Sequence, residues 1–354
     1  MRLRTGGLDG RLLLRLPYGV MGVIAAADFL GGPGAGYLPL LSLGPAFASL
    51  AGGVRRTASI GLLSVTLCVA LAAYNNSLGG RGAYLALLSI IGVTAAAMLA
   101  SELRERKERE LSDIRTVAEV AQRVLLRPVP RRVGPIHAAV SYTSASARAR
   151  IGGDLYEVVT TPDGVRVLVG DVQGKGLDAV ETAAVVLGAF REAAYDEPDL
   201  PGVAVRLERA LSRHLTGEQF VTAVLAEIGP GDKAGLLNCG HPPPLMIRSD
   251  GRTEPADPPD VAPPLGLMDM ATAKAPPFEV DFGPGDQMLL YTDGVIEARD
   301  AAGRFYPLAE RSHLLSTGVE PQEALDRLQN DLVEHVGGPI KDDAAMLLLR
   351  HRSR

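Results

Sequence analysis

The sequence predicts an α+β protein in two parts, an all-helical apolar module followed by a domain of short strands and amphipathic helices. Residues 1–100 contain two acidic and seven basic side chains, a net charge of +5, whereas the rest of the 354-residue chain has a net charge of −10. From residue 135 onward, short aliphatic runs with turn residues alternate with helical stretches. These observations indicate a membrane module joined to an acidic layered domain.

Charge and cysteine content exclude several classes of protein. The acidic second part argues against a nucleic-acid binder, which holds phosphates with clustered Lys and Arg. The absence of Trp and an aromatic content of 5% argue against a base-stacking surface. Two cysteines, Cys68 and Cys239, are too few for a disulfide framework.

Four apolar stretches in the first hundred residues predict about four membrane spans. A helix needs ~20 apolar residues to cross the hydrocarbon core, so the last two stretches are long enough and the first two are marginal, which leaves a re-entrant hairpin as an alternative. The stretches cover residues 16–31, 37–53, 58–76 and 82–100.

Basic residues predict the orientation of these spans. Four arginines precede the first stretch, Arg55 and Arg56 separate the second from the third, and a charged run begins at Glu102. Because Lys and Arg favour the cytoplasmic side, we expect both termini in the cytoplasm. A signal peptide is the competing interpretation of the first stretch. Asp28, near its outer end, is expected to reach the membrane surface, or alternatively to act as a sensor.

Residues 101–127 predict a helical linker between a membrane domain of 1–100 and a second domain of 128–354. Apolar residues recur there every three or four positions, and Pro128 and Pro130 end the pattern. The apolar stripe could pair with a second copy, giving a homodimer, or pack on the domain that follows.

Strands and helices can be assigned in the second domain from their patterns. Neighbouring strands joined by tight turns such as Asp163-Gly164 suggest antiparallel hairpins, which favours a layered α+β domain over a doubly wound sheet. The predicted strands are 136–143, 154–160, 164–172, 220–228, 234–238, 244–248, 278–282, 287–292 and 343–349, and the predicted helices are 177–196, 202–215, 307–316 and 321–336.

Aspartates stand at the ends of these strands, next to glycine or to another acid. They are Asp154, Asp171, Asp293 and the pair Asp342-Asp343. Carboxylates clustered at a sheet edge repel one another, and divalent cations offset that repulsion. Carboxylate, carbonyl and water oxygens suit Mg²⁺ or Mn²⁺, and the histidines lack zinc-ligand spacing.

Two stretches resemble known motifs only in part, and neither matches its motif. The run from Gly170 to Lys175 has its Gly-Lys one residue too early for a P-loop and continues with Gly176 instead of Ser or Thr. Gly152-Gly153-Asp154 continues with Leu155-Tyr156, where a diguanylate cyclase has Glu-Phe.

Taken together, the second part resembles the SpoIIE-type branch of the metal-dependent protein serine/threonine phosphatases (PPM family) over about residues 120–350. The apolar front end resembles membrane-anchored actinobacterial members of this branch. Seven motifs occur in the family's order: residues 150–156 (RIGGDLY), 170–176 (GDVQGKG), 220–223 (FVTA), 238–243 (NCGHPP), 264–267 (PLGL), 290–298 (LYTDGVIEA) and 341–343 (KDD).

The resemblance implies an αββα sandwich with two Mn²⁺ or Mg²⁺ ions at one end of its sheets. By this resemblance Asp171 bridges the ions, the backbone carbonyl of Val172 binds one of them, and Asp293 and Asp342 complete the other. A water activated between the two cations would attack phosphorus directly.

Three further residues receive roles from the same resemblance. Asp154 is expected to support the site directly or through water. Asp343 matches a position that is often Asn in relatives, so it ranks second to Asp342 as a ligand. Lys175 is expected to help hold the phosphate.

The chain departs from the eukaryotic pattern of this family. Gln173 occupies the position of a histidine thought to protonate the leaving group, and the phosphate-gripping arginine has no clear counterpart. His241 is open to two interpretations, a catalytic acid or a residue that shapes a turn. Cys239 replaces an alanine that is common in this branch.

The expected function is therefore a membrane-tethered phosphatase with its catalytic domain in the cytoplasm. The resemblance implies phosphoserine or phosphothreonine substrates on a small anti-sigma-factor antagonist. The alternative is a catalytically weak membrane scaffold that binds the same kind of partner. A transporter is disfavoured because the short spans offer no polar pathway.

Overall fold

The computed structural model describes residues 10–32, 36–143, 152–215, 219–260, 262–268, 276–315, 318–338, 340 and 342–352. Three residues of the motifs above, Arg150, Ile151 and Lys341, lie outside this described part. The chain divides into two compact units, Met1–Ile114 and Arg115–Arg354. The boundary between them falls inside the predicted linker helix.

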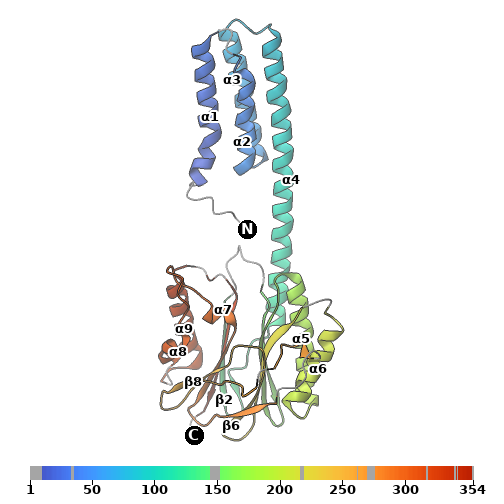
Figure 1. Ribbon diagram of the computed structural model, residues 1–354, viewed down its shortest axis with the longest axis vertical. Coiled ribbons are helices and arrows are strands. Elements are labelled where there is room, and N and C mark those ends of the chain that lie inside the picture. The colour runs from blue at the N-terminus through green and yellow to red at the C-terminus, as the bar shows by residue number, and fades with distance from the viewer. Residues whose placement is uncertain are drawn as a thin grey trace. The chain divides into compact units, whose positions relative to one another are not determined.

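The described residues of the first unit form helices joined by short turns (Figure 1). It contains α1 (Gly10–Gly31), η1 (Leu38–Ser42), α2 (Leu43–Ala51), α3 (Val54–Tyr74) and the first part of α4 (Arg81–Leu125). Three windows in the described residues are long and apolar enough to cross a membrane: Leu14–Gly31, Val54–Tyr74 and Arg81–Glu110. The second predicted stretch forms only η1 and the nine-residue α2, shorter than the ~20 residues that span a bilayer.

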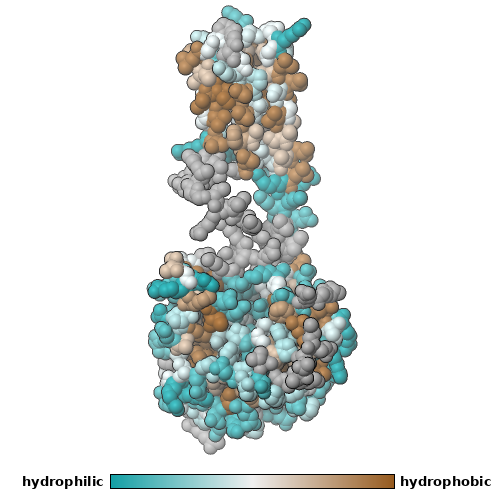
Figure 2. Space-filling view, in the orientation of Figure 1, coloured by the Kyte–Doolittle hydropathy of each residue, from teal (hydrophilic) through white to brown (hydrophobic). Residues whose placement is uncertain are grey.

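Apolar side chains cover the outside of this helical unit as well as its inside. Met21, Leu41, Ile60 and Ile90 pack together in its interior. Figure 2 shows apolar residues gathered on the visible surface of the same helices. The exposed members include Val23, Leu30, Leu50, Leu62, Leu85, Leu88, Ile91 and Leu99. A helix that is apolar all round is typical of a buried or membrane environment.

Asp28 does not reach the surface of this unit, contrary to the sequence-based expectation. Its side chain is 2% exposed, and its Oδ2 atom accepts a hydrogen bond of 3.1 Å from the Asn75 side-chain amide. A buried carboxylate needs a polar partner, and Asn75, just after α3, supplies one. The aspartate therefore links α1 to the end of α3 inside the bundle.

The second unit is built on two antiparallel sheets (Figure 1). The six-stranded sheet has the order β1 (Arg132–Val133), β2 (Ile136–Thr143), β11 (Ala344–His351), β10 (Gln287–Tyr291), β7 (Leu245–Ile247) and β8 (Thr253–Pro255). The five-stranded sheet has the order β3 (Asp154–Thr161), β4 (Gly164–Val172), β5 (Val221–Ile228), β6 (Lys233–Cys239) and β9 (Phe278–Asp281). Each strand lies antiparallel to its neighbours, as the predicted hairpins require.

Helices cover the outer face of each sheet, so the α+β prediction and the αββα sandwich implied by the resemblance are confirmed. Helices α5 (Leu177–Asp196) and α6 (Leu200–Ser212) pack on the five-stranded sheet. Helix α8 (Leu308–Arg311), η3 (Ser312–Leu315) and α9 (Pro321–Val336) pack on the six-stranded sheet. The short β1, β8 and α7 (Asp293–Ile296) were not predicted.

Strand β4 illustrates how the sequence pattern builds these layers. Val165, Val167 and Val169 point into the core between the sheets, whereas Leu168 and Val172 point toward α5 and α6. Successive side chains of a strand alternate between faces, so a strand covered on both faces is largely apolar, as residues 167–169 are. This explains why the apolar run in residues 164–172 predicted a strand.

The C-terminal end of α4 packs on the second unit, to which it belongs. Ala121 and Leu125 contact Val180 of α5, and the Arg191 guanidinium donates a 2.7 Å hydrogen bond to the Leu125 carbonyl. This contact agrees with the packing alternative for the end of the predicted linker. Pairing with a second copy of the chain stays a prediction.

Replacing Leu225 by Ala is expected to destabilise the sandwich. Leu225 is fully buried beneath α5 and α6, and a buried Leu→Ala change costs about 2–5 kcal/mol because it leaves a cavity. Urea unfolding of the full chain in detergent, followed by circular dichroism, measures the loss. Val333→Ala, at a 40% exposed position of α9, serves as the control and should change the midpoint little. Equal effects of the two substitutions would contradict the assigned core.

Candidate metal centre

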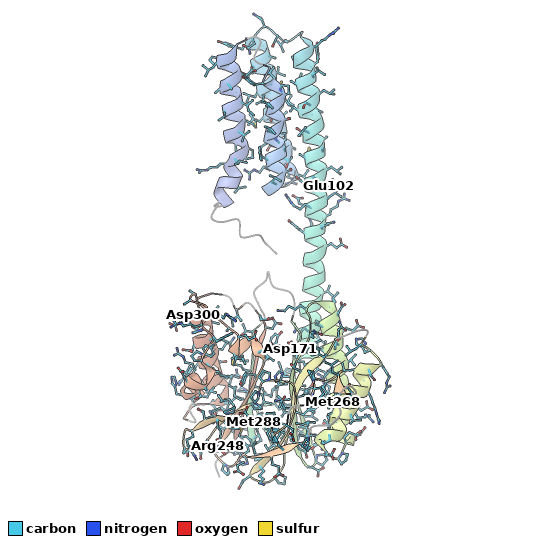
Figure 3. The ribbon with its side chains drawn as sticks, in the orientation of Figure 1. Glu102, Asp171, Arg248, Met268, Met288 and Asp300 are labelled. Atoms are coloured by element: carbon cyan, nitrogen blue, oxygen red, sulfur yellow. The ribbon has the colours of Figure 1, made fainter. Side chains whose placement is uncertain are left out.

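The predicted aspartates of both sheets lie at the same end of the sandwich. Asp154 begins β3 and stands directly opposite Asp171, near the end of β4. Asp293 follows β10, and Asp342 and Asp343 precede β11, the antiparallel neighbour of β10. Figure 3 shows Asp171 at this end and Arg248 at the opposite end of the sandwich. Antiparallel pairing therefore brings together residues that are up to 189 positions apart in the chain.

Asp154 and Asp171 form the part of the site contributed by the five-stranded sheet. Burial, followed by the charge of Asp171, raises the pKa of Asp154 well above its usual range. Burial, followed by the charges of Asp293 and Asp342, raises the pKa of Asp171 to about 7. The Thr292 hydroxyl donates a 2.8 Å hydrogen bond to Asp154 Oδ2, which fixes that carboxyl group.

Asp293 and Asp342 form the part contributed by the six-stranded sheet. Burial, then the charges of Glu297 and Asp342, raise the pKa of Asp293. The Lys175 ammonium forms an ion pair with Asp342 Oδ1. Lys175 follows β4 in the other sheet, so a basic side chain lies beside the predicted ligands. Its phosphate-binding role stays a prediction.

Asp343 lies deeper than Asp342 and is held by several donors. It is 2% exposed, and its Oδ2 atom accepts hydrogen bonds from the Gly152 amide at 2.9 Å and from the Tyr142 hydroxyl at 2.7 Å. Asp342, by contrast, keeps 54% of its side chain exposed. The structure therefore gives the two neighbouring aspartates different surroundings, with Asp342 on the open side.

Gly152 and Gly153 have no side chain where the backbone at the start of β3 lies very close to neighbouring residues. A Cβ at Gly152 would lie 2.1 Å from Asp343 Oδ2, and a Cβ at Gly153 would lie 2.4 Å from the Val172 carbonyl oxygen. Both distances are shorter than any side-chain contact allows. The two glycines thus let the start of β3 approach both Asp343 and the carbonyl that the resemblance assigns to a metal ion.

This donor set fits hard divalent cations. It consists of carboxylate and carbonyl oxygens, and burial, followed by mutual repulsion, raises the pKa of three of the carboxyl groups. Positive charge at the site would offset both effects. Among the described residues, no three His, Cys, Asp or Glu side chains gather tightly enough to hold an ion alone. Mg²⁺ and Mn²⁺ sites of this kind are completed by water and by substrate oxygens.

A cavity of about 260 Å³ opens beside Asp293 and Asp342. Glu297, Arg299 and the apolar side chain of Ile340 also line it. The Arg299 guanidinium lies 4.0 Å from the centre of the Phe305 ring, an arrangement that favours a fixed position. The cavity adjoins the carboxylates on the side where Asp342 is exposed.

Two residues missed in the sequence connect α4 to this site. The Gln122 side-chain amide donates hydrogen bonds to the Tyr142 hydroxyl at 2.8 Å and to the Gly152 carbonyl at 3.2 Å. Tyr142 in turn donates to Asp343. Gln122 sits in the predicted linker and Tyr142 in an ordinary strand, so neither carried a signal of function. Thr292 lies within a quoted motif but had no assigned role.

His241 and Cys239 are both buried and occupy the core side of the site. His241 is 5% exposed, and burial lowers its pKa to about 4, so the ring is neutral near pH 7. Burial raises the pKa of the Cys239 thiol to about 12, which leaves it unreactive. The burial of His241 agrees with the interpretation as a residue that shapes a turn, and its role as a catalytic acid stays an untested alternative. Gln173 is exposed, and its backbone amide donates to the Phe220 carbonyl at 2.9 Å.

Comparison with known proteins identifies relatives of the second unit. The family model for stage II sporulation protein E (SpoIIE) matches residues 161–352. Protein IcfG of Synechocystis sp. is 24% identical over 238 residues, which are 57% of this chain and 36% of IcfG, so the chain spans about a third of that relative. Phosphoserine phosphatase RsbU of Bacillus subtilis is 23% identical over 268 residues, 74% of this chain and 77% of RsbU.

A solved structure supports the same fold. The SiaA PP2C domain of Pseudomonas aeruginosa is similar with a TM-score of 0.59 at 18% identity, covering 69% of this chain and 98% of that domain. The SpoIIE family model accounts for more than half of the chain. The chain therefore belongs to the SpoIIE family, as its ordered motifs indicated.

Proposed function

We propose that this chain is a membrane-anchored, metal-dependent protein phosphatase that hydrolyses phosphoserine or phosphothreonine. The observation that carries the proposal is the meeting of Asp154, Asp171, Asp293 and Asp342 at one end of both sheets, with the pKa of three of them raised. The similarity to a phosphoserine phosphatase supports the chemistry. The neighbouring cavity of about 260 Å³ offers room for the phosphorylated side chain.

The residues of the site would divide the work as follows. Asp171, Asp293, Asp342 and the Val172 carbonyl would hold two Mn²⁺ or Mg²⁺ ions, with Asp154 supporting them and Asp343 fixing the strand start beside them. When bound, such ions supply charge neutralisation for the phosphoryl group and lower the pKa of a water molecule.

Lys175 would bind a phosphate oxygen. Its ammonium already pairs with Asp342 across the site, and a phosphoryl group entering there would compete for the same donor. The described part of the site contains no Cys or Ser that could act as an exposed nucleophile beside these carboxylates. We propose direct attack by a water molecule that the bound ions would activate.

The anchor and the partner are part of the same proposal. The three long apolar helices, with Arg55 and Arg56 between two of the apolar stretches, support a multi-pass anchor with the catalytic unit in the cytoplasm. The family resemblance favours a small anti-sigma-factor antagonist as the phosphoprotein substrate. We also propose that α4 carries a signal to the site through Gln122, from the membrane module or from dimerisation through 101–127.

Metal-dependent turnover is the first test. The full chain in detergent should hydrolyse an aryl phosphate with Mn²⁺ and lose this activity with chelator. Asp171→Asn should lower kcat/KM by at least about a hundredfold, because ligand loss weakens both metal binding and catalysis. Asp163→Asn, in the exposed turn at the other end of the same hairpin, is the matched control. A folded wild-type protein that is inactive with every metal would favour the scaffold function.

Stability should depend on pH through Asp171 when no metal is bound. Its pKa is raised to about 7 in the folded protein, above an unfolded value of about 3.9, so the folded state binds the proton more tightly. The associated stability is present below pH ~4 and is lost as the pH rises through 7. Asp171→Asn should therefore raise the metal-free melting temperature more at pH 8 than at pH 4.5. If Asp171→Asn changes the melting temperature by the same amount at every pH in this range, the raised pKa of Asp171 is refuted.

The contact between α4 and the site should matter for activity. Gln122→Ala removes one buried and one partly buried hydrogen bond and leaves the Gly152 carbonyl and the Tyr142 hydroxyl with fewer partners, at a cost of about 1–3 kcal/mol. We expect a lower kcat with Mn²⁺ at saturation, measured on the folded full chain. Val124→Ala, at a 74% exposed position of the same helix turn, is the control. Unchanged kcat in Gln122→Ala would remove this route of communication.

A further inference from the structure

We propose that His241 is a positioning residue that ties the two sheets together at the metal centre. This inference rests on the proposed metal site and adds a role that the sequence left open between a catalytic acid and a turn. The imidazole contacts the Thr222 hydroxyl of the five-stranded sheet and the Tyr291 carbonyl of the six-stranded sheet. Both residues lie close to a predicted metal ligand. The ring therefore fixes the spacing between Asp171 and Asp293.

The backbone of His241 is itself held rigidly. The Asn238 side chain accepts a 2.8 Å hydrogen bond from the His241 amide and donates a 2.8 Å hydrogen bond to the His241 carbonyl. Gly240, between them, has φ +68°, a left-handed conformation that glycine adopts without strain. Strand β6 thus ends in a closed polar loop that aims the imidazole ring in one direction.

The two ring nitrogens reach different sheets. His241 Nε2 lies 3.1 Å from the Tyr291 carbonyl oxygen at the end of β10. A carbonyl only accepts, so Nε2 carries the proton and Nδ1 is left as an acceptor. Nδ1 lies 3.1 Å from the Thr222 hydroxyl on β5, which therefore donates to it.

Both contacts adjoin predicted ligands. Thr222 is the register partner of Asp171 on the neighbouring strand, and its hydroxyl oxygen lies 3.4 Å from the Asp171 carbonyl oxygen. Tyr291 is two residues before Asp293. A displacement of one sheet relative to the other would stretch the bonds of His241 before it separated the carboxylates.

Directional bonds are needed because the core between the sheets is apolar. Apolar side chains of this core, such as Val169 and Leu290, favour close packing but not one lateral position of the sheets. A functional site requires its groups to be held within about 0.5 Å. Other contacts also join the sheets at this end, among them Thr292 with Asp154, Asp343 with Gly152 and the ion pair of Lys175 with Asp342. Each of these three uses a predicted ligand carboxylate, whereas the link through His241 uses none, so it can persist while the carboxylates bind ions.

His241→Phe tests this role because it keeps a ring of similar size and removes both hydrogen bonds. The full chain in detergent is first stripped of metal, and Mn²⁺ affinity is measured by titration calorimetry. We expect Kd for Mn²⁺ to rise about ten- to a hundredfold, with KM for an aryl phosphate unchanged at saturating Mn²⁺. His241→Gln, which retains a donor for Tyr291, should give an intermediate affinity.

Two further variants separate positioning from packing. His351→Phe replaces a buried histidine at the opposite end of β11 and should leave Mn²⁺ affinity unchanged. Thr222→Val removes the hydroxyl partner at constant shape and should weaken Mn²⁺ binding in the same direction as His241→Phe. Because the two residues share one link, the double variant should bind Mn²⁺ less weakly than the product of the single effects.

The outcomes distinguish this inference from the proposed function. Wild-type affinity in both His241→Phe and Thr222→Val would overturn the positioning role while leaving the metal site intact. Additive effects in the double variant would also overturn it. A wild-type protein that binds no Mn²⁺ would instead overturn the proposed function. If His241→Phe does not fold, Thr222→Val and the comparison with His351→Phe decide the question.

Discussion

The arrangement of the catalytic unit depends on one electrostatic constraint. Two pairs of carboxyl groups, one from each sheet, meet at a partly buried end of the sandwich, where burial and mutual repulsion raise the pKa of Asp154, Asp171 and Asp293. Such an arrangement costs stability unless positive charge enters it. The fold must therefore hold together groups that repel one another. The contacts that achieve this determine the arrangement of the other residues of the site.

The sandwich meets this constraint with directional contacts at its end and apolar packing elsewhere. Thr292, His241 and the Gly152–Asp343 contact each connect one sheet to the other. Glycines at 152 and 153 allow the backbone to approach where any side chain would collide. The hydrophobic layers beneath supply most of the stability, whereas these few polar contacts determine the geometry.

The position of α4 gives the site a connection to the rest of the chain. Its last turns belong to the catalytic unit, where Gln122 shares a hydrogen-bond network with Tyr142, Gly152 and Asp343. In the proposed function, a change in the position of this helix would reach the predicted ligands through the network, because hydrogen bonds tolerate only small displacements. Asp28 provides a comparable polar contact inside the helical unit, where it meets Asn75.

The sequence by itself determined the two-part organisation, the main strands and helices, and the aspartates at the strand ends. These features are local: apolar period, turn residues and neighbouring glycines can all be recognised in a short window, as for β4 and Asp171. Only the tertiary structure decided that Asp28 is buried, that Gln122 and Tyr142 adjoin the site, and that His241 joins two sheets. Each of these depends on partners 19 to 201 residues away in the chain. Such contacts are set by how the layers pack, which no local pattern specifies.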